Sequence, residues 1–446
     1  MSTDAVIPLP SDAESPQEEF KFVPPVPETI EELGVPLSMV EQMILKILYF
    51  RGDCSGRLLA STLGLNYSVI APMVETMKRQ HLLMAKSSLG MGDVSSTFAM
   101  TENARELVRE HIESNSYTGR IPVPLEQYTV GVKLQRHKSD WLTREMLAKA
   151  FSHMVMNETI LSQLGPAVNA GKSFLIYGQP GNGKTFLAEG LFHIASEPIF
   201  VPFAIEYQGQ IIQIYDPIYH HRIDEDEPEM SAFHRERDFD GRWFRCKRPF
   251  IMSGGELSLE MLDLSFNPAS KVYDAPFHLK ANNGIYLIDD FGRQKVSPTE
   301  VLNRWIVPME RHIDFLTFRT GGKAQVPFEC FLVFSTNLRP QQLGDEAFLR
   351  RIQYKMFVRS PELAEFTLIF RRFCESQNIE CDEAALEAYL DKRYLRAGKP
   401  FRRCQPRDVI THAIDLIRFE RLPYQLTAEV LDRAFEMAFV SEEYEE

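Results

Sequence analysis

One stretch of the sequence constrains the fold more than any other: FLIYGQPGNGKTFLAEGLF, residues 174–192. Its first four residues are apolar or aromatic, which predicts a buried strand, and its last part has the pattern of an amphipathic helix. Glycines let a backbone curl so that its amides face phosphate groups, and the start of a helix adds partial positive charge. Strand, loop and helix in this order therefore predict a phosphate-binding loop. The loop has the pattern G-x-x-x-x-G-K-T, formed by Gly178, Gln179, Pro180, Gly181, Asn182, Gly183, Lys184 and Thr185.

A second apolar run, IYLIDD at residues 285–290, ends in two adjacent carboxylates. Neighbouring carboxylates repel each other unless a cation, a proton or a reaction uses them. Beside a phosphate loop, Lys184 is expected to reach the β and γ phosphates of a nucleotide, while Thr185 and Asp289 hold Mg²⁺. Asp290 is then expected to polarise the attacking water. A solvated strand end without function is the alternative.

The 446 residues exceed what one ordinary domain contains, and the pattern changes several times along them. Continuous apolar strands alternate with helices after residue 136, which favours an α/β fold with a parallel sheet covered on both faces. One helix is predicted over 139–165, and strands are predicted at 172–178, 197–205, 284–289, 330–336 and 353–358. The predicted divisions are a disordered acidic tail (1–33), a winged-helix-like domain (34–116), a linker (117–135), an α/β core (136–360) with an insertion at about 205–283, a helical lid (361–440) and an acidic tail (441–446).

The N-terminal domain resembles a winged helix-turn-helix, because three helical patterns, a β-hairpin and a final helix follow one another between 37 and 115. Eight Lys or Arg residues in this range oppose eight Asp or Glu residues, so its net charge is zero. The helix that would read DNA, at about 66–81, is apolar at its start, where base-reading side chains normally lie, and Lys78 and Arg79 come late. A role in protein docking or oligomer organisation therefore stands beside DNA binding.

The formal charge of −13 says little about partners, because most of it lies in the two predicted tails. Residues 1–33 hold eight acids and one base, the last six residues hold four acids, and the rest is nearly neutral. No domain-wide basic field exists to drive nonspecific nucleic-acid binding. The six cysteines show no paired or zinc-like spacing, which indicates a reducing compartment. No leader or membrane segment is evident, so cytoplasmic localisation is expected.

The phosphate loop, IYLIDD, FLVFSTN, DEAFLRR and QPRDV occur in an order that resembles an AAA+ ATPase, over about 120–440. The resemblance implies ATP and Mg²⁺ as ligands and Asn337 as a polar sensor at the end of the strand between the two motif strands. It implies that Arg350 or Arg351 is an arginine finger that reaches a neighbouring subunit's nucleotide. It also implies that Arg407 is the second sensor. Because a finger acts in trans, a homo-oligomeric ring is expected, with six subunits.

Within the family, ANNG before IYLIDD and a hairpin in 315–330 are similar to MoxR-like ATPases and bacterial enhancer-binding activators. One position departs from the pattern, since most members have Glu where this chain has Asp290. The shorter side chain sets the carboxylate back by about 1–1.5 Å, a misplacement that can cost on the order of a hundredfold in rate. Slow hydrolysis is therefore a hypothesis.

Three functions are open from the sequence: a ring ATPase that remodels a protein partner as a MoxR-like chaperone does, a DNA-directed ATPase such as a transcription activator or a transposition or replication helper, and a slowly hydrolysing or non-hydrolysing scaffold or switch. The insertion either faces the central pore or the substrate, or is a passive surface elaboration. Its His220, His221, His234 and Cys246 lack metal-ligand spacing.

Overall fold

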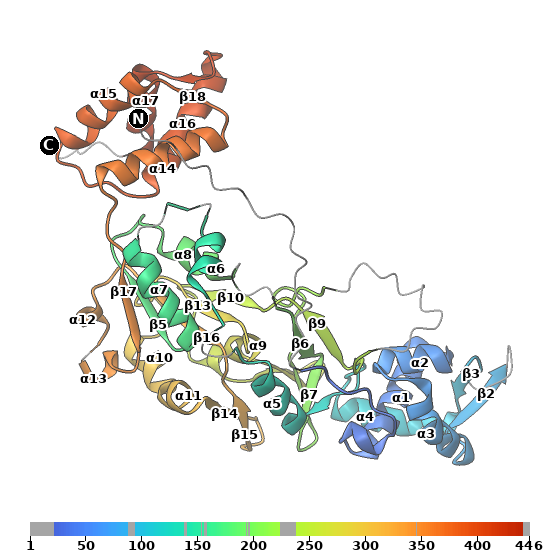
Figure 1. Cartoon of the computed structure of the whole chain (residues 1–446). Helices are drawn as coiled ribbons and strands as arrows, with labels where there is room; N and C mark the ends of the chain where they lie inside the picture. The colour runs from blue at the N-terminus through green and yellow to red at the C-terminus, as the bar shows by residue number, and fades with distance from the viewer. Residues whose placement is uncertain are drawn as a thin grey trace, which may run out of the picture.

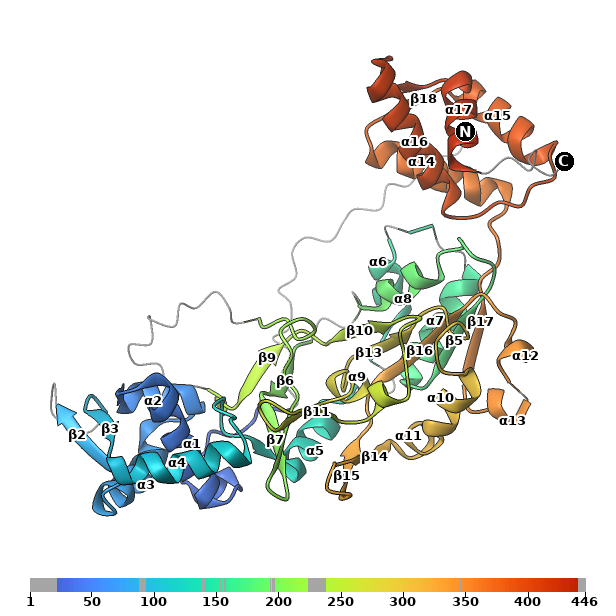
Figure 2. The same ribbon diagram turned by 180° about the vertical axis from the view of Figure 1, so that it is seen from behind.

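A computed structural model describes residues 22–87, 94–137, 141–152, 154–155, 158–192, 194, 197–223, 238–344 and 346–439. An N-terminal helical unit and a C-terminal helical unit lie at opposite ends of a central α/β core (Figure 1). The same arrangement is seen from behind in Figure 2. No helix in the described ranges is long and apolar enough to span a membrane.

The central sheet has five parallel strands in the order β10-β13-β16-β5-β17. Strand β16 lies between β5, which leads into the phosphate loop, and β13, which leads into the two carboxylates. All five strands therefore present their carboxyl ends at one edge, where the sequence places its polar motifs. The strands are β5 (Phe174–Tyr177), β10 (Phe250–Ser253), β13 (Ile285–Ile288), β16 (Phe331–Thr336) and β17 (Tyr354–Phe357).

Helices cover both faces of this sheet, as its continuous apolar strands predict. Alternate side chains of β13 enter different cores: Leu287 packs with the helices of one face, and Tyr286 packs with those of the other. One face carries α6 (Arg144–Ala150), α7 (Glu158–Ala170) and α8 (Lys184–Phe192). The other face carries α10 (Pro298–Arg304) and α11 (Ile306–Arg311), and the short helices α12 (Pro340–Leu343) and α13 (Glu346–Leu349) precede β17.

Two sequence predictions for the core are wrong. The helix expected over 139–165 is two helices, α6 and α7, because α6 ends at Ala150 with Phe151 buried beneath the turn. The strand expected at 197–205 is not in the core sheet. Its first part is β6 (Ile199–Pro202), which pairs antiparallel with β9 (Trp243–Cys246), and β10 occupies the sheet edge instead. A short apolar run does not reveal its partner.

The insertion folds into a second sheet that joins the N-terminal unit to the core. On neighbouring positions of one strand, Ala204 packs into the N-terminal unit's core, whereas Ile205 packs into the core beneath β14 and β15. The sheet is thus packed on both sides as part of the fold. That the insertion faces the central pore or the substrate stays a prediction. Its strand order is β11-β12-β8-β7-β4, where β4 is Val123–Pro124. The elements are β7 (Ala204–Tyr207), β8 (Gln210–Gln213), η2 (Glu260–Leu262), β11 (Ser265–Asn267), β12 (Val272–Asp274) and α9 (Phe277–Lys280), followed after β13 by the hairpin β14 (Ile313–Thr317) and β15 (Lys323–Pro327).

Among the histidines of the insertion, His220 has a structural role. His220 is buried, and its ring nitrogens bond the amide of Asp216 and the carbonyl of Lys280 at 2.9 Å each. Burial lowers its pKa to about 4, so the ring stays neutral and links the loop that contains Asp216 to Lys280, the last residue of α9. Cys246 is buried and His221 is exposed, while His234 lies outside the described residues.

Residues 22–33, predicted to belong to a disordered tail, are packed against the molecule. Phe22 meets the ring of Trp243 edge to face at 5.7 Å, and Leu33 at the end of η1 (Glu31–Leu33) is fully buried. The carbonyl of Pro24 accepts a hydrogen bond from the amide of Asp240 at 2.9 Å. The prolines and acids of this stretch predicted disorder. The stretch is ordered because it packs against residues of the insertion, such as Trp243 and Asp240.

The predicted linker, 117–135, is also part of the fold. It contains β4 (Val123–Pro124), which pairs with β7, and α5 (Leu125–Leu134). Val123 and Tyr128 are buried in the same core as the insertion. Pro124 immediately precedes α5, a position where a missing amide costs nothing.

The N-terminal unit contains every element that the sequence predicts there, with one added strand. Its three strands have the order β1-β3-β2 and are antiparallel. Its assignment as a winged helix stays a prediction. The elements are α1 (Leu37–Arg51), β1 (Cys54–Ser55), α2 (Gly56–Leu63), α3 (Tyr67–Arg79), β2 (Leu83–Ser87), β3 (Thr97–Met100) and α4 (Glu102–Ser114).

The C-terminal unit is a helical bundle with its own apolar core, as predicted from the loss of strand signals after residue 361. Phe366, Phe370 and Leu431 are fully buried there. The elements are α14 (Leu363–Ser376), β18 (Glu380–Cys381), α15 (Glu383–Leu390), a π-helix (Asp391–Leu395), α16 (Gln405–Glu420), β19 (Gln425–Leu426) and α17 (Ala428–Ala438).

The packing of residues 22–33 can be tested at Leu33. Leu33→Ala should reduce the free energy of unfolding by roughly 2–5 kcal/mol, because it removes a fully buried side chain. Val23→Ala, at a side chain that is 44% exposed, should change it by less than about 0.5 kcal/mol. Urea unfolding measures both. Equally small effects would mean that this segment does not contribute to the fold.

A pH-dependent test concerns Lys46, whose side chain is buried in α1 and donates to Asn115 Oδ1 at 2.8 Å. Burial lowers its pKa from 10.5 to about 8. Since the unfolded chain binds this proton more tightly, folding is penalised below about pH 8, and the penalty disappears as the pH rises towards 10.5.

The stability difference between wild type and Lys46→Met should therefore shrink as the pH rises from 8 to 10.5, with the variant more stable at pH 7. Thermal unfolding across this range measures it. A difference that stays constant with pH would show that the ammonium is solvated.

Candidate nucleotide-binding site

The phosphate loop follows β5 at the carboxyl edge of the sheet and curls through three glycines with positive φ. Gly181 and Gly183 have φ values of 76° and 80°, in the left-handed region that favours glycine. At Gly178, with φ of 152°, a Cβ would lie 2.4 Å from the carbonyl oxygen of Val358. The backbone of the loop thus has its shape because side chains are absent at these positions.

Lys184 begins α8 and points back into the loop. Its side-chain nitrogen donates to Asn337 Oδ1 at 2.6 Å and to the carbonyl of Gln179 at 3.1 Å. The residue is only 7% exposed. Burial lowers the pKa of its ammonium, and the carboxylates of Asp289 and Asp290 oppose that shift.

Thr185 and Asp289 form a pair at the end of β13. The Thr185 hydroxyl donates to Asp289 Oδ2 at 2.9 Å, and the side-chain amide of Gln294 donates to the Asp289 carbonyl at 2.8 Å. One hydroxyl and one carboxylate suit Mg²⁺, which is usually held by few protein oxygens together with phosphates and water. Among the described residues, no group of three His, Cys, Asp or Glu is placed to hold a metal ion.

Asp290 and Asn337 connect the ends of β13 and β16. The Asn337 side-chain amide donates to Asp290 Oδ1 at 3.0 Å, while its oxygen accepts from Lys184. Asp290 has φ of 48°, a conformation that Asp tolerates better than longer side chains do. A continuous hydrogen-bonded chain therefore runs from the phosphate loop through Asn337 to Asp290.

The C-terminal unit touches the phosphate loop through residues that sequence reasoning missed. The amide of Cys404 donates to the Gly181 carbonyl at 2.9 Å. Arg402 Nη1 donates to Ser360 Oγ at 2.6 Å, and the same hydroxyl accepts from the Asn182 side chain at 3.3 Å. The sequence feature that could have predicted this contact is the pair of adjacent arginines, Arg402 and Arg403, shortly before QPRDV. Arg403 is instead held by Glu365 at 2.7 Å.

The three predicted arginines lie elsewhere. Arg407 is 66% exposed and pairs with its neighbour Asp408 at 3.0 Å. Arg350, 77% exposed, pairs with Glu346 at 2.9 Å, and Arg351 lies 3.7 Å from Glu310. The structure places Arg350 and Arg351 directly after α13, before β17. Their roles, and that of Arg407, stay predictions.

A family described as "Domain of unknown function (DUF8689)" matches residues 362–437, which form the C-terminal helical unit. No match was found among the curated proteins. Solved structures with some likeness include NtrX from Brucella abortus, with 14% identity and a TM-score of 0.37, over 63% of this chain and 55% of that one. The chain thus spans about half the length of NtrX.

Two further likenesses are equally distant. A RuvB mutant from Thermotoga maritima has 14% identity and a TM-score of 0.35, over 68% of this chain and 73% of that one. A magnesium chelatase complex of BchI and BchD has 17% identity and a TM-score of 0.33, over 65% of this chain and 94% of that one. The strand order and the loop geometry described above define the α/β fold with its phosphate loop.

The contacts between the C-terminal unit and the phosphate loop can be tested by comparing two arginines. We expect Arg402→Ala to weaken binding of a non-hydrolysable ATP analogue with Mg²⁺ by about tenfold or more, the effect of losing one charge-assisted hydrogen bond. Arg407→Ala should weaken it by less than about threefold, because Arg407 faces solvent. Equilibrium titration with a fluorescent analogue measures both.

Arg396→Ala, at an arginine that is 79% exposed and paired with Asp391, serves as the control for loss of surface charge. A larger effect at Arg407 than at Arg402 would favour the assignment of Arg407 as second sensor and contradict this prediction.

Proposed function

We propose that this chain is a Mg²⁺-dependent ATPase of the AAA+ class that assembles into a ring and remodels a protein partner, as a MoxR-like chaperone does. The observation that carries the proposal is one hydrogen-bonded set in which the phosphate loop, the strand-end carboxylates and the sensor amide meet. Lys184 contacts Asn337, Asn337 contacts Asp290, and Thr185 contacts Asp289. An accidental strand end would not supply these partners together.

Different residues of the site bind the phosphates and the metal ion. The amides of the loop and the start of α8 surround the phosphates, and Lys184 exchanges its bonds to Asn337 and Gln179 for phosphate oxygens. Thr185 and Asp289 would hold Mg²⁺, which neutralises negative charge on the phosphates when bound.

Asp290 polarises a water that attacks the γ phosphorus, so that the bond to the β-phosphate oxygen breaks and ADP and phosphate form. Asn337 already holds one oxygen of Asp290 at 3.0 Å, which positions the carboxylate before the water arrives. Once phosphate draws Lys184 away, the Asn337 oxygen becomes available to orient that water. The sensor thereby links phosphate binding to activation of the base.

The arginines near α13 support the proposal of a ring of subunits. Among the described residues, Arg350 pairs with Glu346 of the short helix α13 that precedes it, and its side chain is largely exposed, which suits contact with the nucleotide of an adjacent subunit. Arg351 is less exposed and lies near Glu310 of α11. We propose Arg350 as the finger and a homo-hexamer as the assembly.

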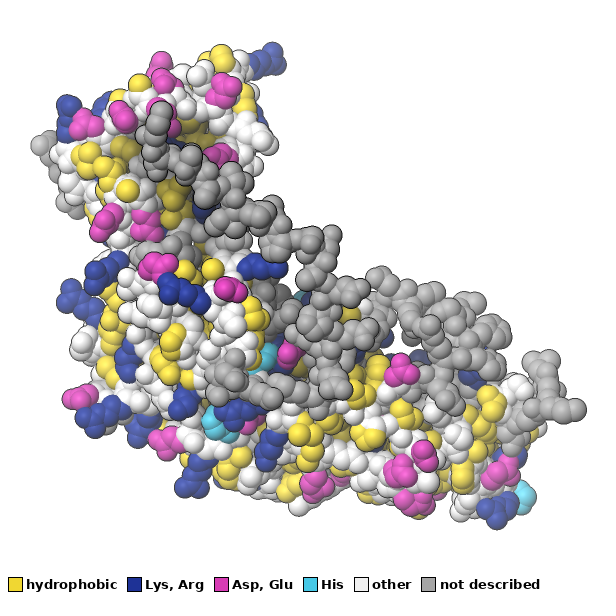
Figure 3. Space-filling view, in the orientation of Figure 1, with side chains coloured by type: hydrophobic (Ala, Val, Ile, Leu, Met, Phe, Trp, Pro, Cys, Tyr) yellow, Lys and Arg dark blue, Asp and Glu magenta, His cyan; other side chains and the backbone are white. Residues whose placement is uncertain are grey.

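A protein partner is favoured over DNA by the N-terminal unit. In the first turns of α3, which would face DNA bases, Val69 and Ile70 are buried and the exposed positions are Ser68 and Pro72, so no basic side chain faces outward there. Lys78 pairs with Glu75 at 2.6 Å, and Arg79 bonds Thr76. In the view of Figure 3, acidic and basic side chains are interspersed over this unit.

The nature of the partner can be tested with an ATP-locked form. Asp290→Ala should retain nucleotide and hold its partner, whereas Lys184→Ala, which loses the phosphate contact, should release it. Affinity capture with both variants, followed by protein and nucleic-acid identification, measures the difference. Recovery of nucleic acid alone with Asp290→Ala, together with turnover that DNA stimulates, would support the DNA-directed alternative instead.

The second candidate function is a slowly hydrolysing ATP-dependent switch, and the reason to consider it is Asp290. The side chain of Asp290 is one methylene shorter than that of the Glu found at this position in most AAA+ proteins, and its backbone has φ of 48°. If the short reach limits the rate, Asp290→Glu should raise ATP turnover despite the added backbone strain of the longer side chain. No gain would remove the reason for the switch hypothesis.

Hydrolysis by the proposed base is tested with Asp290→Asn, which keeps the side-chain size and tolerates the same φ. We expect the rate of phosphate release to fall by about a hundredfold or more, while affinity for ATP stays within about threefold. Turnover that is unaffected by this change would exclude Asp290 as the water-polarising group.

A further inference from the structure

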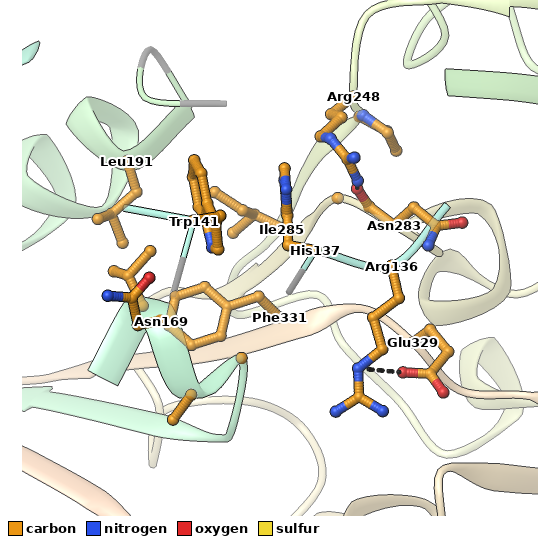
Figure 4. Close-up of a pocket in the computed structure, with 15 residues that line it drawn as sticks. Arg136, His137, Trp141, Asn169, Leu191, Arg248, Asn283, Ile285, Glu329 and Phe331 are labelled. Atoms are coloured by element: carbon orange, nitrogen blue, oxygen red, sulfur yellow. Dashed lines mark hydrogen bonds and ion pairs between the residues drawn. The ribbon is translucent and has the colours of Figure 1, made fainter. Parts of the chain in front are cut away.

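A cavity of about 290 Å³ lies at the edge of the central sheet opposite the phosphate loop. Ile285 and Phe331, the first residues of β13 and β16, line it together with Leu191 of α8 (Figure 4). Val168 of α7 is also a lining residue. Ile285 and Asp289 are four residues apart on one strand, a separation of roughly 13 Å. The cavity is therefore distinct from the proposed nucleotide site.

The aromatic wall is Trp141, whose ring stacks on His137 with centroids 4.0 Å apart and planes at 11°. Figure 4 shows both rings beside Ile285, above Phe331. Apolar walls with a few fixed polar groups are the usual lining of small-molecule pockets, and this volume is near the lower limit of their range of about 300–1,000 Å³. The size suits a ligand of one or two rings.

The fixed polar group is Arg248, which is 7% exposed. Its two terminal nitrogens donate to the carbonyls of Asn283 at 2.7 Å and Gln135 at 3.1 Å, and one of them lies 3.6 Å from Glu197. Within the described residues, its Nε is buried and has no hydrogen-bond partner. An atom sealed in this way is not open to the cavity, so the donor that a ligand there would meet is a terminal N–H: the contacts above use at most three of the five N–H groups of the guanidinium, and Arg248 lines the cavity.

Among the described residues around the cavity, the charges cancel. Arg248 faces Glu197, and Arg136 lies 3.6 Å from Glu329, which also approaches His312 at 3.5 Å. Each arginine thus already has a carboxylate, so an anionic ligand would gain no net attraction and would approach two acids. The electrostatics favour an uncharged ligand.

We propose that this cavity binds a small, flat, uncharged aromatic heterocycle that packs between Trp141 and Phe331 and presents a hydrogen-bond acceptor to Arg248. An aromatic hydrocarbon, such as the side chain of a docked phenylalanine, would fill the same space but leave the Arg248 donor unsatisfied. The site does not depend on the proposed ATPase activity, since it shares no residue with the phosphate loop.

Caffeine is a suitable probe, because it is flat and uncharged and carries only acceptors, and indole is its counterpart with only a donor. Trp141 is the reporter: Trp243 and Trp305 are 2% and 0% exposed, and neither lines the cavity. Fluorescence excited at a wavelength selective for tryptophan, with saturating Mg²⁺ and ADP to occupy the nucleotide site, should show saturable quenching by caffeine. Indole, followed by calorimetry, should bind at least about tenfold more weakly.

Two variants connect the signal to the cavity. Ala170→Leu adds volume at a lining position and keeps Arg248, and it should weaken caffeine binding by about tenfold or more. Ala388→Leu, the same change at an exposed position of α15, should leave it within about twofold. Thermal unfolding of both variants confirms that they fold.

Three outcomes overturn the proposal: no saturable quenching by caffeine, quenching that Ala170→Leu does not weaken, or indole binding as tightly as caffeine. The last outcome would show a purely apolar recess, suited to an aromatic side chain of a protein partner. Loss of ATP turnover in the tests above would leave this binding unchanged, so failure of the two proposals can be told apart.

Discussion

The parallel arrangement of β5, β16 and β13 is the constraint on which the rest of the candidate site depends. Parallel strands bring all their carboxyl ends to one edge, so residues distant in sequence become neighbours there. Lys184 follows the first strand, Asn337 the second and Asp290 the third, and the hydrogen bonds among them repeat that strand order. If β16 did not lie between the other two, Asn337 could not bond to both.

The same geometry separates the two ends of the sheet. Polar residues gather at the carboxyl edge, where loop amides and helix α8 face outward, whereas the amino edge is lined by apolar residues such as Ile285 and Phe331 with one buried arginine. The two edges are connected by the strands themselves, each only four to six residues long. A molecule bound at one edge thus lies close to the elements that position the other.

The insertion sheet is the physical link between the N-terminal unit and the core. Alternate residues of β7 pack into different apolar clusters, so the sheet belongs to both bodies at once. The buried pair of Arg242 and Asp240 adds a polar contact there, because Arg242 also donates to the carbonyl of Leu33. Such continuous burial favours movement of the N-terminal unit and the core together. The C-terminal unit contacts the phosphate loop separately, through the segment before α16.

The sequence by itself predicted the α/β class, the phosphate loop, the strand-end carboxylates and the helical C-terminal unit, because these depend on local pattern and on residue types with few alternatives. It missed the packing of residues 22–33, the contribution of α5 and the contacts of Arg402, and it placed β6 in the wrong sheet. These features depend on which distant surface meets a segment, and periodicity carries no information about partners. Only the tertiary structure decided them, since burial and pairing arise from contacts across the chain.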